Sequence, residues 1–262
     1  MFRIDELKKK LENGGLAIGT HVKWREASFS ELFAMEGYDY IWIDGEHSAL
    51  TLDMVAAQVR AAQANGAAAF YRVPWNDPVL VKPVLEIGMD GVIFPFIRTA
   101  KEAAAAVAAC KYPPEGIRGY APGRAIRYGL TPMEEYFEQA KKTWVIAQLE
   151  HIDAVRNLDE ILSVPGIDAF VVGMMDLSAS IGKIGQLRDP QLLGLLDEIG
   201  EKCRADGRPF GVSMGYMPEI VEEWMARGAR LISVGGDEEF LVKQGTATLK
   251  GMKELFQKEV AR

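Results

Sequence analysis

The sequence has few cysteines and no long apolar run. Among its 262 residues only Cys110 and Cys203 are cysteines, far apart and without C-x-x-C spacing. A disulfide framework or a structural zinc site is therefore not expected. No stretch approaches the ~20 apolar residues that a membrane-spanning helix needs, and the charged N-terminus lacks the apolar segment of a signal peptide. These absences predict a cytoplasmic protein with no membrane partner.

Positive charge is also scarce. The chain carries 30 Lys and Arg against 37 Asp and Glu, a net charge of -7, with no run of basic residues. A nucleic-acid partner is therefore disfavoured. Glycine spacings of the Walker or dinucleotide-binding type are missing, so nucleotide cofactors are not indicated. The 48% of hydrophobic residues can instead bury a large core, which is typical of an acidic globular enzyme.

Short β-branched or aromatic runs alternate with segments of helical period along the whole chain. This alternation predicts one (β/α)₈ TIM barrel over 1–262, since such barrels take ~250 residues. An open doubly wound sheet is the alternative. The segment from about 238 to 260 is longer than one capping helix needs, and it could pack on a neighbouring subunit. The predicted strands are 16–22, 40–44, 68–73, 91–95, 144–150, 169–173, 209–214 and 230–234.

Polar residues follow four of the predicted strands. In a (β/α)₈ barrel the carboxyl ends of the strands surround the active site, so these side chains should converge on one mouth. The second strand ends in Asp44-Gly45-Glu46-His47, and the third ends in Arg72. The fifth and sixth strands contribute Gln148, Glu150, Met175 and Asp176.

Glu150 and Asp176 end adjacent strands, which would place two carboxylates close enough to bind one cation. Two carboxylates with sites left open to water and substrate suit Mg²⁺ or Mn²⁺. Each acid could instead cap the helix that follows it, or the pair could be the acid and base of a glycosidase. The neighbouring Arg72 and His47 favour an anionic, enolisable ligand over a glycoside.

His47 is the candidate general base, with Asp44 three residues earlier placed to orient it and raise its basicity. Strand alternation predicts that Glu46 points away from the site. Arg72 would neutralise a developing enolate oxygen, although it could simply form a salt bridge in the barrel mouth. His21, at the end of the first strand, could line the substrate entrance.

Gln148 lies two residues before Glu150 and therefore on the same strand face, where it could hydrogen-bond the same ligand. The segment containing Met175 and Asp176 turns the chain out of the sixth strand. Successive backbone N–H groups in such a turn can hold a carboxylate. Gln148, Met175 and Asp176 are therefore the predicted substrate-binding residues.

Four motifs together resemble the HpcH/HpaI aldolase family from about residue 5 to residue 255. The resemblance implies a class II pyruvate aldolase on a (β/α)₈ barrel. Glu150 and Asp176 match the ligands of a divalent metal ion (Mg²⁺, Mn²⁺ or Co²⁺). Arg72 matches the arginine that holds the keto oxygen, His47 with Asp44 matches the base dyad, and Gln148 matches a pocket glutamine. The motifs are Ile43-Asp44-Gly45-Glu46-His47, Tyr112-Pro113-Pro114-Glu115-Gly116-Ile117-Arg118-Gly119, Gln148-Leu149-Glu150 and Val172-Gly173-Met174-Met175-Asp176-Leu177-Ser178.

The resemblance further implies a homo-oligomer, a hexamer or a trimer, in which the last helix packs on a neighbour. Its partners would be small molecules, a 2-oxo acid and an aldehyde. Gly173-Met174-Met175-Asp176 departs from the family's usual Gly-Pro-Ala-Asp, and Tyr120-Ala121-Pro122-Gly123-Arg124 is bulkier than usual, so the acceptor is left open. Three alternatives remain: a Schiff-base aldolase, for which Lys23 is the only near lysine, a related 2-oxo acid decarboxylase or acyl-CoA lyase, and a non-catalytic 2-oxo acid binding protein.

Overall fold

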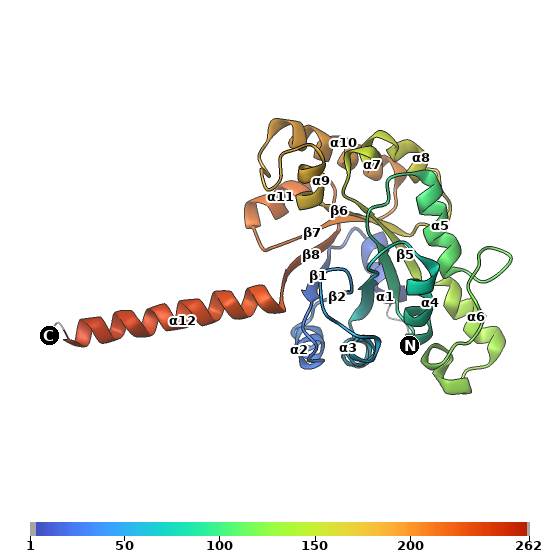
Figure 1. The fold of residues 1–262 in the computed structure, drawn as a ribbon, viewed down its shortest axis with the longest axis horizontal. Coiled ribbons are helices and arrows are strands. Elements are labelled where there is room, and N and C mark those ends of the chain that lie inside the picture. The colour runs from blue at the N-terminus through green and yellow to red at the C-terminus, as the bar shows by residue number, and fades with distance from the viewer. Residues whose placement is uncertain (1–3, 261–262) are drawn as a thin grey trace.

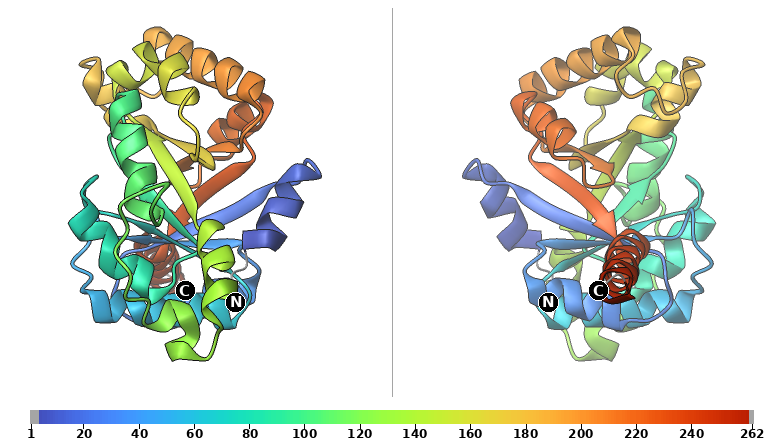
Figure 2. Two further views of the ribbon diagram at one scale, coloured as in Figure 1. Left: turned by 90° about the vertical axis from the view of Figure 1, so that its right-hand side faces the viewer. Right: turned by 90° about the vertical axis from the view of Figure 1, so that its left-hand side faces the viewer.

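The computed structural model describes residues 4–260, which contain a closed barrel of eight parallel strands in the order β1 to β8 (Figure 1 and Figure 2). Each strand pairs with its sequence neighbours, and β8 closes the barrel on β1. The predicted TIM barrel is confirmed, and all eight predicted strands are present. Their bounds are β1 Ala17–Val22, β2 Tyr40–Asp44, β3 Ala68–Arg72, β4 Gly91–Phe94, β5 Trp144–Leu149, β6 Ala169–Gly173, β7 Phe210–Met214 and β8 Leu231–Gly236.

Helices follow the strands and cover the outside of the barrel (Figure 2). Asp77 caps α4 by accepting a hydrogen bond from the Val79 N–H, with Pro78 at the first helical position. The segment after β5 forms two short helices that are separated at Asn157. The helices are α1 Ile4–Glu12, α2 Ser28–Glu36, α3 Leu52–Ala64, α4 Pro78–Ile87, α5 Ala100–Cys110, α6 Met133–Lys141, α7 Ile152–Arg156, α8 Leu158–Leu162, α9 Met174–Ser180, α10 Pro190–Asp206, α11 Pro218–Ala226 and α12 Asp237–Val260, with a 3₁₀ segment at Arg124–Gly129.

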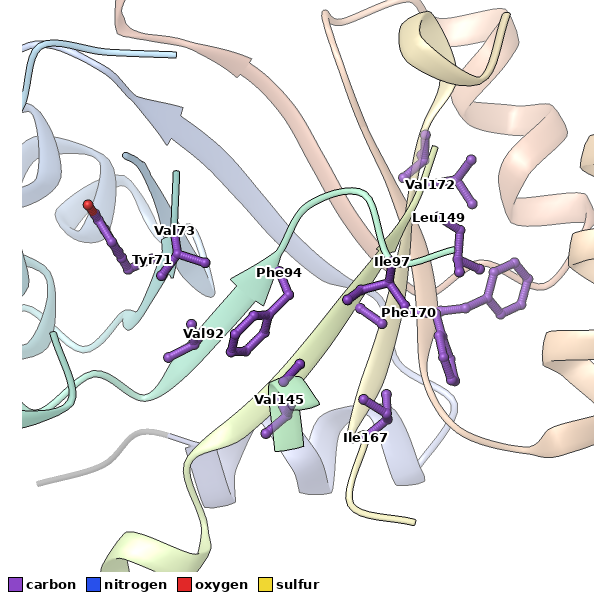
Figure 3. Packing of buried hydrophobic residues seen from close by; sticks show 14 of the residues in the cluster. Tyr71, Val73, Val92, Phe94, Ile97, Val145, Leu149, Ile167, Phe170 and Val172 are labelled. Carbon is purple, nitrogen blue, oxygen red and sulfur yellow. The ribbon is translucent and has the colours of Figure 1, made fainter. Parts of the chain in front are cut away.

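Side chains alternate between the two faces of the barrel wall, as the two-residue period of a strand requires. One face packs against the surrounding helices, and Figure 3 shows part of this layer, including Phe94, Leu149 and Phe170. The other face fills the barrel interior with a second cluster that contains Tyr40, Trp42, Phe70, Trp144 and Ile146.

The buried residues of α1, Ile4 and Leu7, belong to the same interior cluster, so α1 closes the end of the barrel opposite the strand C-termini. The barrel interior is therefore packed at the end where the strands begin. Only the mouth at the C-terminal ends of the strands is left for polar side chains.

Helix α12 runs from the end of β8 away from the barrel (Figure 1). Of its 24 residues only Asp237 is buried. Seven large apolar side chains beyond its first turn are exposed: Leu241, Val242, Leu249, Met252, Leu255, Phe256 and Val260. Within the described part of the chain no helix is both long and apolar enough to cross a membrane.

Candidate active site

The barrel mouth is lined by the last inward-facing residues of several strands. On β5 the interior residues Trp144 and Ile146 are followed at the same period by Gln148 and then by Glu150, just beyond the strand. On β2 and β3 the same alternation ends in Asp44 and Arg72, which are register partners. Parallel pairing of neighbouring strands therefore gathers an ion pair and a carboxylate at one end of the barrel, as predicted.

Arg72 is held by two carboxylates. Its Nε donates to Asp44 Oδ1 at 3.0 Å and its Nη2 donates to Asp44 Oδ2 at 2.6 Å. Its Nη1 lies 2.9 Å from Glu46 Oε2, and its Cζ lies 5.5 Å from the ring centroid of Trp42. This bidentate geometry fixes the guanidinium plane in a nearly buried position.

The pKa of Asp44 reflects two opposing effects. Burial alone would raise it, but the charge and hydrogen bonds of Arg72 outweigh burial and hold the pKa below its ordinary value. Asp44 Oδ1 also accepts hydrogen bonds from the backbone N–H groups of Glu46 and His47, at 3.0 and 3.2 Å. Asp44 is therefore a charged anchor for both the guanidinium and the loop that follows β2.

Glu46 faces the site, and the prediction that it points away is wrong. Its carboxylate contacts Arg72, and burial raises its pKa, with further upward contributions from the charges of Asp44 and Asp176. The strand ends at Asp44 and the next residues form bends, so the two-residue alternation no longer applies at position 46.

His47 lies on the rim of the mouth with its side chain 58% exposed. Its Nε2 is 3.6 Å from Glu46 Oε2. The structure brings the backbone N–H of His47, and not its ring, to the Asp44 carboxylate. Asp44 therefore orients the loop that carries His47 and does not contact the imidazole directly.

Glu150 is 1% exposed, and two donors hold its carboxylate. Oε1 accepts from the Phe96 backbone N–H at 2.8 Å, and Oε2 accepts from Gln148 Nε2. Burial, together with the negative charges of Glu46 and Asp176, raises the pKa of Glu150 to about 8. Gln148 Oε1 is buried and has no hydrogen-bond partner among the described residues.

Phe96 is a site residue that the sequence did not reveal. It lies in the loop after β4 and has a φ of 51°, which is unusual for a residue with a side chain. This conformation accompanies the hydrogen bond from its N–H to Glu150. A phenylalanine in a loop carries no sequence signal for such a role.

Met175 and Asp176 lie in the first turn of α9, directly after β6. Asp176 is half-buried and Met175 is 52% exposed. The charge of Asp176 helps to raise the pKa of both Glu46 and Glu150, which indicates that the three carboxylates lie in the same region of the mouth. Backbone N–H groups in a first helical turn have no partner within the helix.

The donor set fits a hard divalent cation. Glu46, Glu150 and Asp176 are mutually repelling carboxylates, and the unpaired Gln148 Oε1 adds a buried oxygen acceptor. A cation would offset the burial and the carboxylate repulsion that together raise the pKa of Glu150. As the side chains stand, no group of three or more His, Cys, Asp or Glu residues within 4–260 is placed to hold a metal ion. A cation held by Glu150 and Asp176, the predicted ligands, would therefore have to complete its coordination with water or substrate.

His21 lines a cavity on the side of the mouth formed by β1, β7 and β8, together with Asp44 and Arg72. The structure thus places His21 at the barrel mouth, and its role at a substrate entrance stays a prediction. Lys23 also borders the cavity, but its side chain is 33% exposed and its Nζ lies 3.8 Å from Glu238 Oε2. It lacks the buried, unpaired environment that activates a Schiff-base lysine.

A barrel closed in this way, with an arginine and several carboxylates at the C-terminal mouth, defines an enzyme of the TIM-barrel class. The family model for the HpcH/HpaI aldolase/citrate lyase matches residues 18–243. The chain belongs to the HpcH/HpaI aldolase/citrate lyase family, and it is a lyase of the aldolase type.

The chain is similar to curated and solved members of that family along most of its length. It is 35% identical over 245 residues to a 2-dehydro-3,6-dideoxy-6-sulfogluconate aldolase of Pseudomonas putida, covering 93% of this chain and 95% of the relative. It is 36% identical over 246 residues to a 4-hydroxy-2-oxovalerate aldolase of Rhodococcus jostii (strain RHA1), covering 93% and 94%. The crystal structure of an HpcH/HpaI aldolase from Desulfitobacterium hafniense DCB-2 superposes with a TM-score of 0.86 at 30% identity, covering 97% and 96%.

Proposed function

We propose that the protein is a divalent-metal-dependent aldolase that cleaves 4-hydroxy-2-oxo acids to pyruvate and an aldehyde, or joins the two in the reverse direction. The observation that carries the proposal is the rigid guanidinium of Arg72 in the same mouth as Glu150 and Asp176. Such a site suits an enolisable 2-oxo acid. The similarity to a relative named as a 4-hydroxy-2-oxovalerate aldolase supports the same substrate class.

Glu150 and Asp176 would hold the metal ion, for which the all-oxygen donor set favours Mg²⁺, Mn²⁺ or Co²⁺. The ion would supply Lewis acidity toward the oxygens of the 2-oxo acid. Gln148 would keep the Glu150 carboxylate oriented through its hydrogen bond to Oε2.

Arg72 is the proposed stabiliser of the enolate oxygen. Its guanidinium is fixed before substrate arrives by Asp44 and Glu46, so little reorganisation is needed when negative charge develops. Asp44 is the residue that positions it. A substrate carboxylate would be held by the backbone N–H groups of Met175 and Asp176 at the start of α9.

His47 is the proposed base that removes a methyl proton from the bound 2-oxo acid. Its ring is open to solvent at the rim, which suits a group that must pass protons to and from water. Asp44 holds the His47 backbone, and Glu46 lies beside the ring. Both contacts restrict where the imidazole can reach.

Deuterium exchange into the methyl group of pyruvate, followed by NMR, tests this function. EDTA-stripped protein is compared with protein to which Mg²⁺, Mn²⁺ or Co²⁺ has been restored. We expect exchange only with metal. Folded protein that exchanges no methyl protons with any of the three ions would contradict the proposal, and it would also be the result expected of a binding protein without turnover.

Borohydride reduction in the presence of pyruvate separates this mechanism from a Schiff-base aldolase. The 3.8 Å contact of Lys23 with Glu238 predicts no covalent adduct. A mass increase on any lysine after reduction would favour the covalent mechanism instead. Product analysis after incubation with a 2-oxo acid, or with an acyl-CoA, separates aldol chemistry from the decarboxylase and acyl-CoA lyase alternatives.

We also propose that the protein is a homo-oligomer, a hexamer or a trimer, in which α12 packs on a neighbouring copy. The exposed apolar residues of α12 and its course away from its own barrel support this proposal (Figure 1). Light scattering of the full chain and of a chain ending at residue 243 tests it. Equal molecular mass per particle, allowing for the residues removed, would contradict the role of α12.

A further inference from the structure

The side of the mouth away from Glu150 and Asp176 contains a cavity between the ends of β1, β7 and β8, which we call the rim cavity. It is lined by His21, Lys23, Ser213 and the first residues of α12, and Arg72 and Asp44 form its inner wall. Because Arg72 borders both spaces, the rim cavity adjoins the proposed site of the 2-oxo acid. The rim cavity is where the aldehyde part of the substrate would lie.

His21 fixes the hydrogen-bonding character of the inner part of the rim cavity. Its Nδ1 lies 3.2 Å from Ser233 Oγ and 3.3 Å from the Gly235 carbonyl oxygen. The carbonyl can only accept and the hydroxyl oxygen can also accept, so we assign the proton to Nδ1, where it serves both oxygens. Nε2 is then an acceptor, and the Ser213 hydroxyl, 3.0 Å away, donates to it. Burial, followed by the charge of Arg72, lowers the pKa of His21 to about 4, so this tautomer is neutral at pH 7.

Ser213 consequently presents lone pairs, and not its proton, to a ligand in the rim cavity. Its hydroxyl donates its proton in the hydrogen bond to His21 Nε2. A ligand group beside Ser213 must therefore bring a donor of its own. A hydroxyl group satisfies this requirement, whereas a carboxylate, a sulfonate or a methyl group does not.

The outer part of the rim cavity is acidic. Its lining contains the carboxylates of Asp237, Glu238 and Glu239 and a single ammonium group, that of Lys23. The Lys23 ammonium already lies 3.8 Å from Glu238, and Asp237 accepts hydrogen bonds from the backbone N–H groups of Lys23 and Trp24 at 2.9 Å each. Repulsion between like charges therefore disfavours a second negative charge on the ligand.

We propose that the rim cavity selects an uncharged, hydroxylated aldehyde as the acceptor, and rejects acceptors that carry a carboxylate or sulfonate. This inference rests on the proposed aldolase function. In the reaction, the methyl carbon of pyruvate forms a bond to the aldehyde carbon, and the aldehyde oxygen takes up a proton to become the 4-hydroxyl group. The proton lost from the methyl group balances it, and no other reactant is needed.

Two matched pairs of acceptors test the selection with the metal-loaded full-length enzyme. Glyceraldehyde and propanal differ in hydroxyl groups, and succinic semialdehyde and butanal differ in the terminal carboxylate. We expect kcat/KM to be at least tenfold higher for glyceraldehyde than for propanal. We expect it to be at least tenfold lower for succinic semialdehyde than for butanal.

Variants then assign the two preferences to residues. Glu238→Gln/Glu239→Gln should raise the succinic semialdehyde to butanal ratio of kcat/KM about tenfold. The matched control Glu134→Gln/Glu135→Gln changes the net charge equally on α6 and should leave that ratio as in the unmodified chain. Ser213→Ala should lower the glyceraldehyde to propanal ratio severalfold. Each ratio compares two acceptors with the same variant, so a change in the fraction of active enzyme does not alter it.

The results separate this inference from the function on which it rests. Methyl exchange with pyruvate together with a preference for succinic semialdehyde over butanal would overturn the selection, and would make Lys23 an anion-binding residue. Equal kcat/KM ratios in the α12 double variant and its control would also overturn it. Absence of any methyl exchange would overturn the aldolase function, and the selection with it.

Discussion

Gly173 gives the sharpest test of how the carboxylate site is built. It ends β6 beside Glu150, with φ -93° and ψ 91°, a conformation open to any residue. A Cβ added there would lie 2.4 Å from Glu150 Oε2 and 3.0 Å from Gln148 Nε2. Glycine is therefore required for space and not for backbone freedom. Because the added Cβ would also lie 2.9 Å from Glu150 Cβ, Gly173→Ala must displace the Glu150 side chain and disturb its hydrogen bond from the Gln148 amide.

The expected size of the effect follows from this geometry. Inserting one carbon into a packed site destabilises a protein by roughly 1–3 kcal/mol. Displacing a catalytic group by about 1 Å lowers turnover on the order of 100-fold. We therefore expect Gly173→Ala to fold, to unfold at a lower temperature, and to lose about 100-fold in methyl exchange together with much of its Mn²⁺ affinity.

The measurements are Mn²⁺ titration calorimetry, pyruvate methyl exchange and thermal unfolding. The control is Gly194→Ala in α10, where a Cβ would meet no atom within 4 Å. Alanine should stabilise this helix by up to about 1 kcal/mol and leave metal binding as it is. The reasoning is refuted if Gly173→Ala binds Mn²⁺ and exchanges protons as the Gly194→Ala control does.

Three further substitutions test individual charges. Arg72→Ala should lower the rate of methyl exchange by at least about 1000-fold, and a near-normal rate would rule out its role. Because the change leaves two carboxylates unpaired, it should also destabilise the fold by roughly 3–5 kcal/mol in urea unfolding. His21 resists protonation in the folded state, because folding lowers its pKa from 6.5 to about 4. As the pH falls from 6.5 to 4, the free energy of unfolding of the native chain should therefore drop by up to about 3 kcal/mol relative to that of His21→Gln. Parallel curves of stability against pH would contradict this. Folding raises the pKa of Glu150 from 4.5 to about 8. The metal-free protein should therefore lose stability relative to Glu150→Gln as the pH rises through that interval. A difference in stability between the two proteins that does not change with pH would show that burial does not raise this pKa.

Much of the fold could be predicted because the barrel repeats one simple pattern. Runs such as Trp144–Leu149 are apolar on both faces, which is expected only where helices cover a parallel sheet. The same alternation correctly placed Gln148 and Glu150 inside the mouth. The predicted side-chain directions are correct wherever a strand continues, because side chains two positions apart point to the same face of the strand.

The site was harder to predict where the strands end. Glu46 lies past the last residue of β2, so a local bend decides its direction. The Asp44–Arg72 pair depends on the register between two strands, and the sequence pattern of one strand carries no information about it. The role of the Phe96 N–H depends on a φ of 51° in a loop. These features arise from tertiary contacts between segments 28 to 54 residues apart.

The charge balance of the mouth leads to a last prediction, on the order of binding. Four carboxylates, Asp44, Glu46, Glu150 and Asp176, surround one guanidinium, which Asp44 and Glu46 already compensate. A 2-oxo acid adds another negative charge, so without a cation its binding to this region is opposed by repulsion. Pyruvate and Mn²⁺ should therefore each tighten the binding of the other by the same factor, since coupling of two ligands is reciprocal. Titration calorimetry in both orders measures that factor. A pyruvate Kd that is unaffected by Mn²⁺ would show that Arg72 binds the acid without help from the Glu150 side of the mouth.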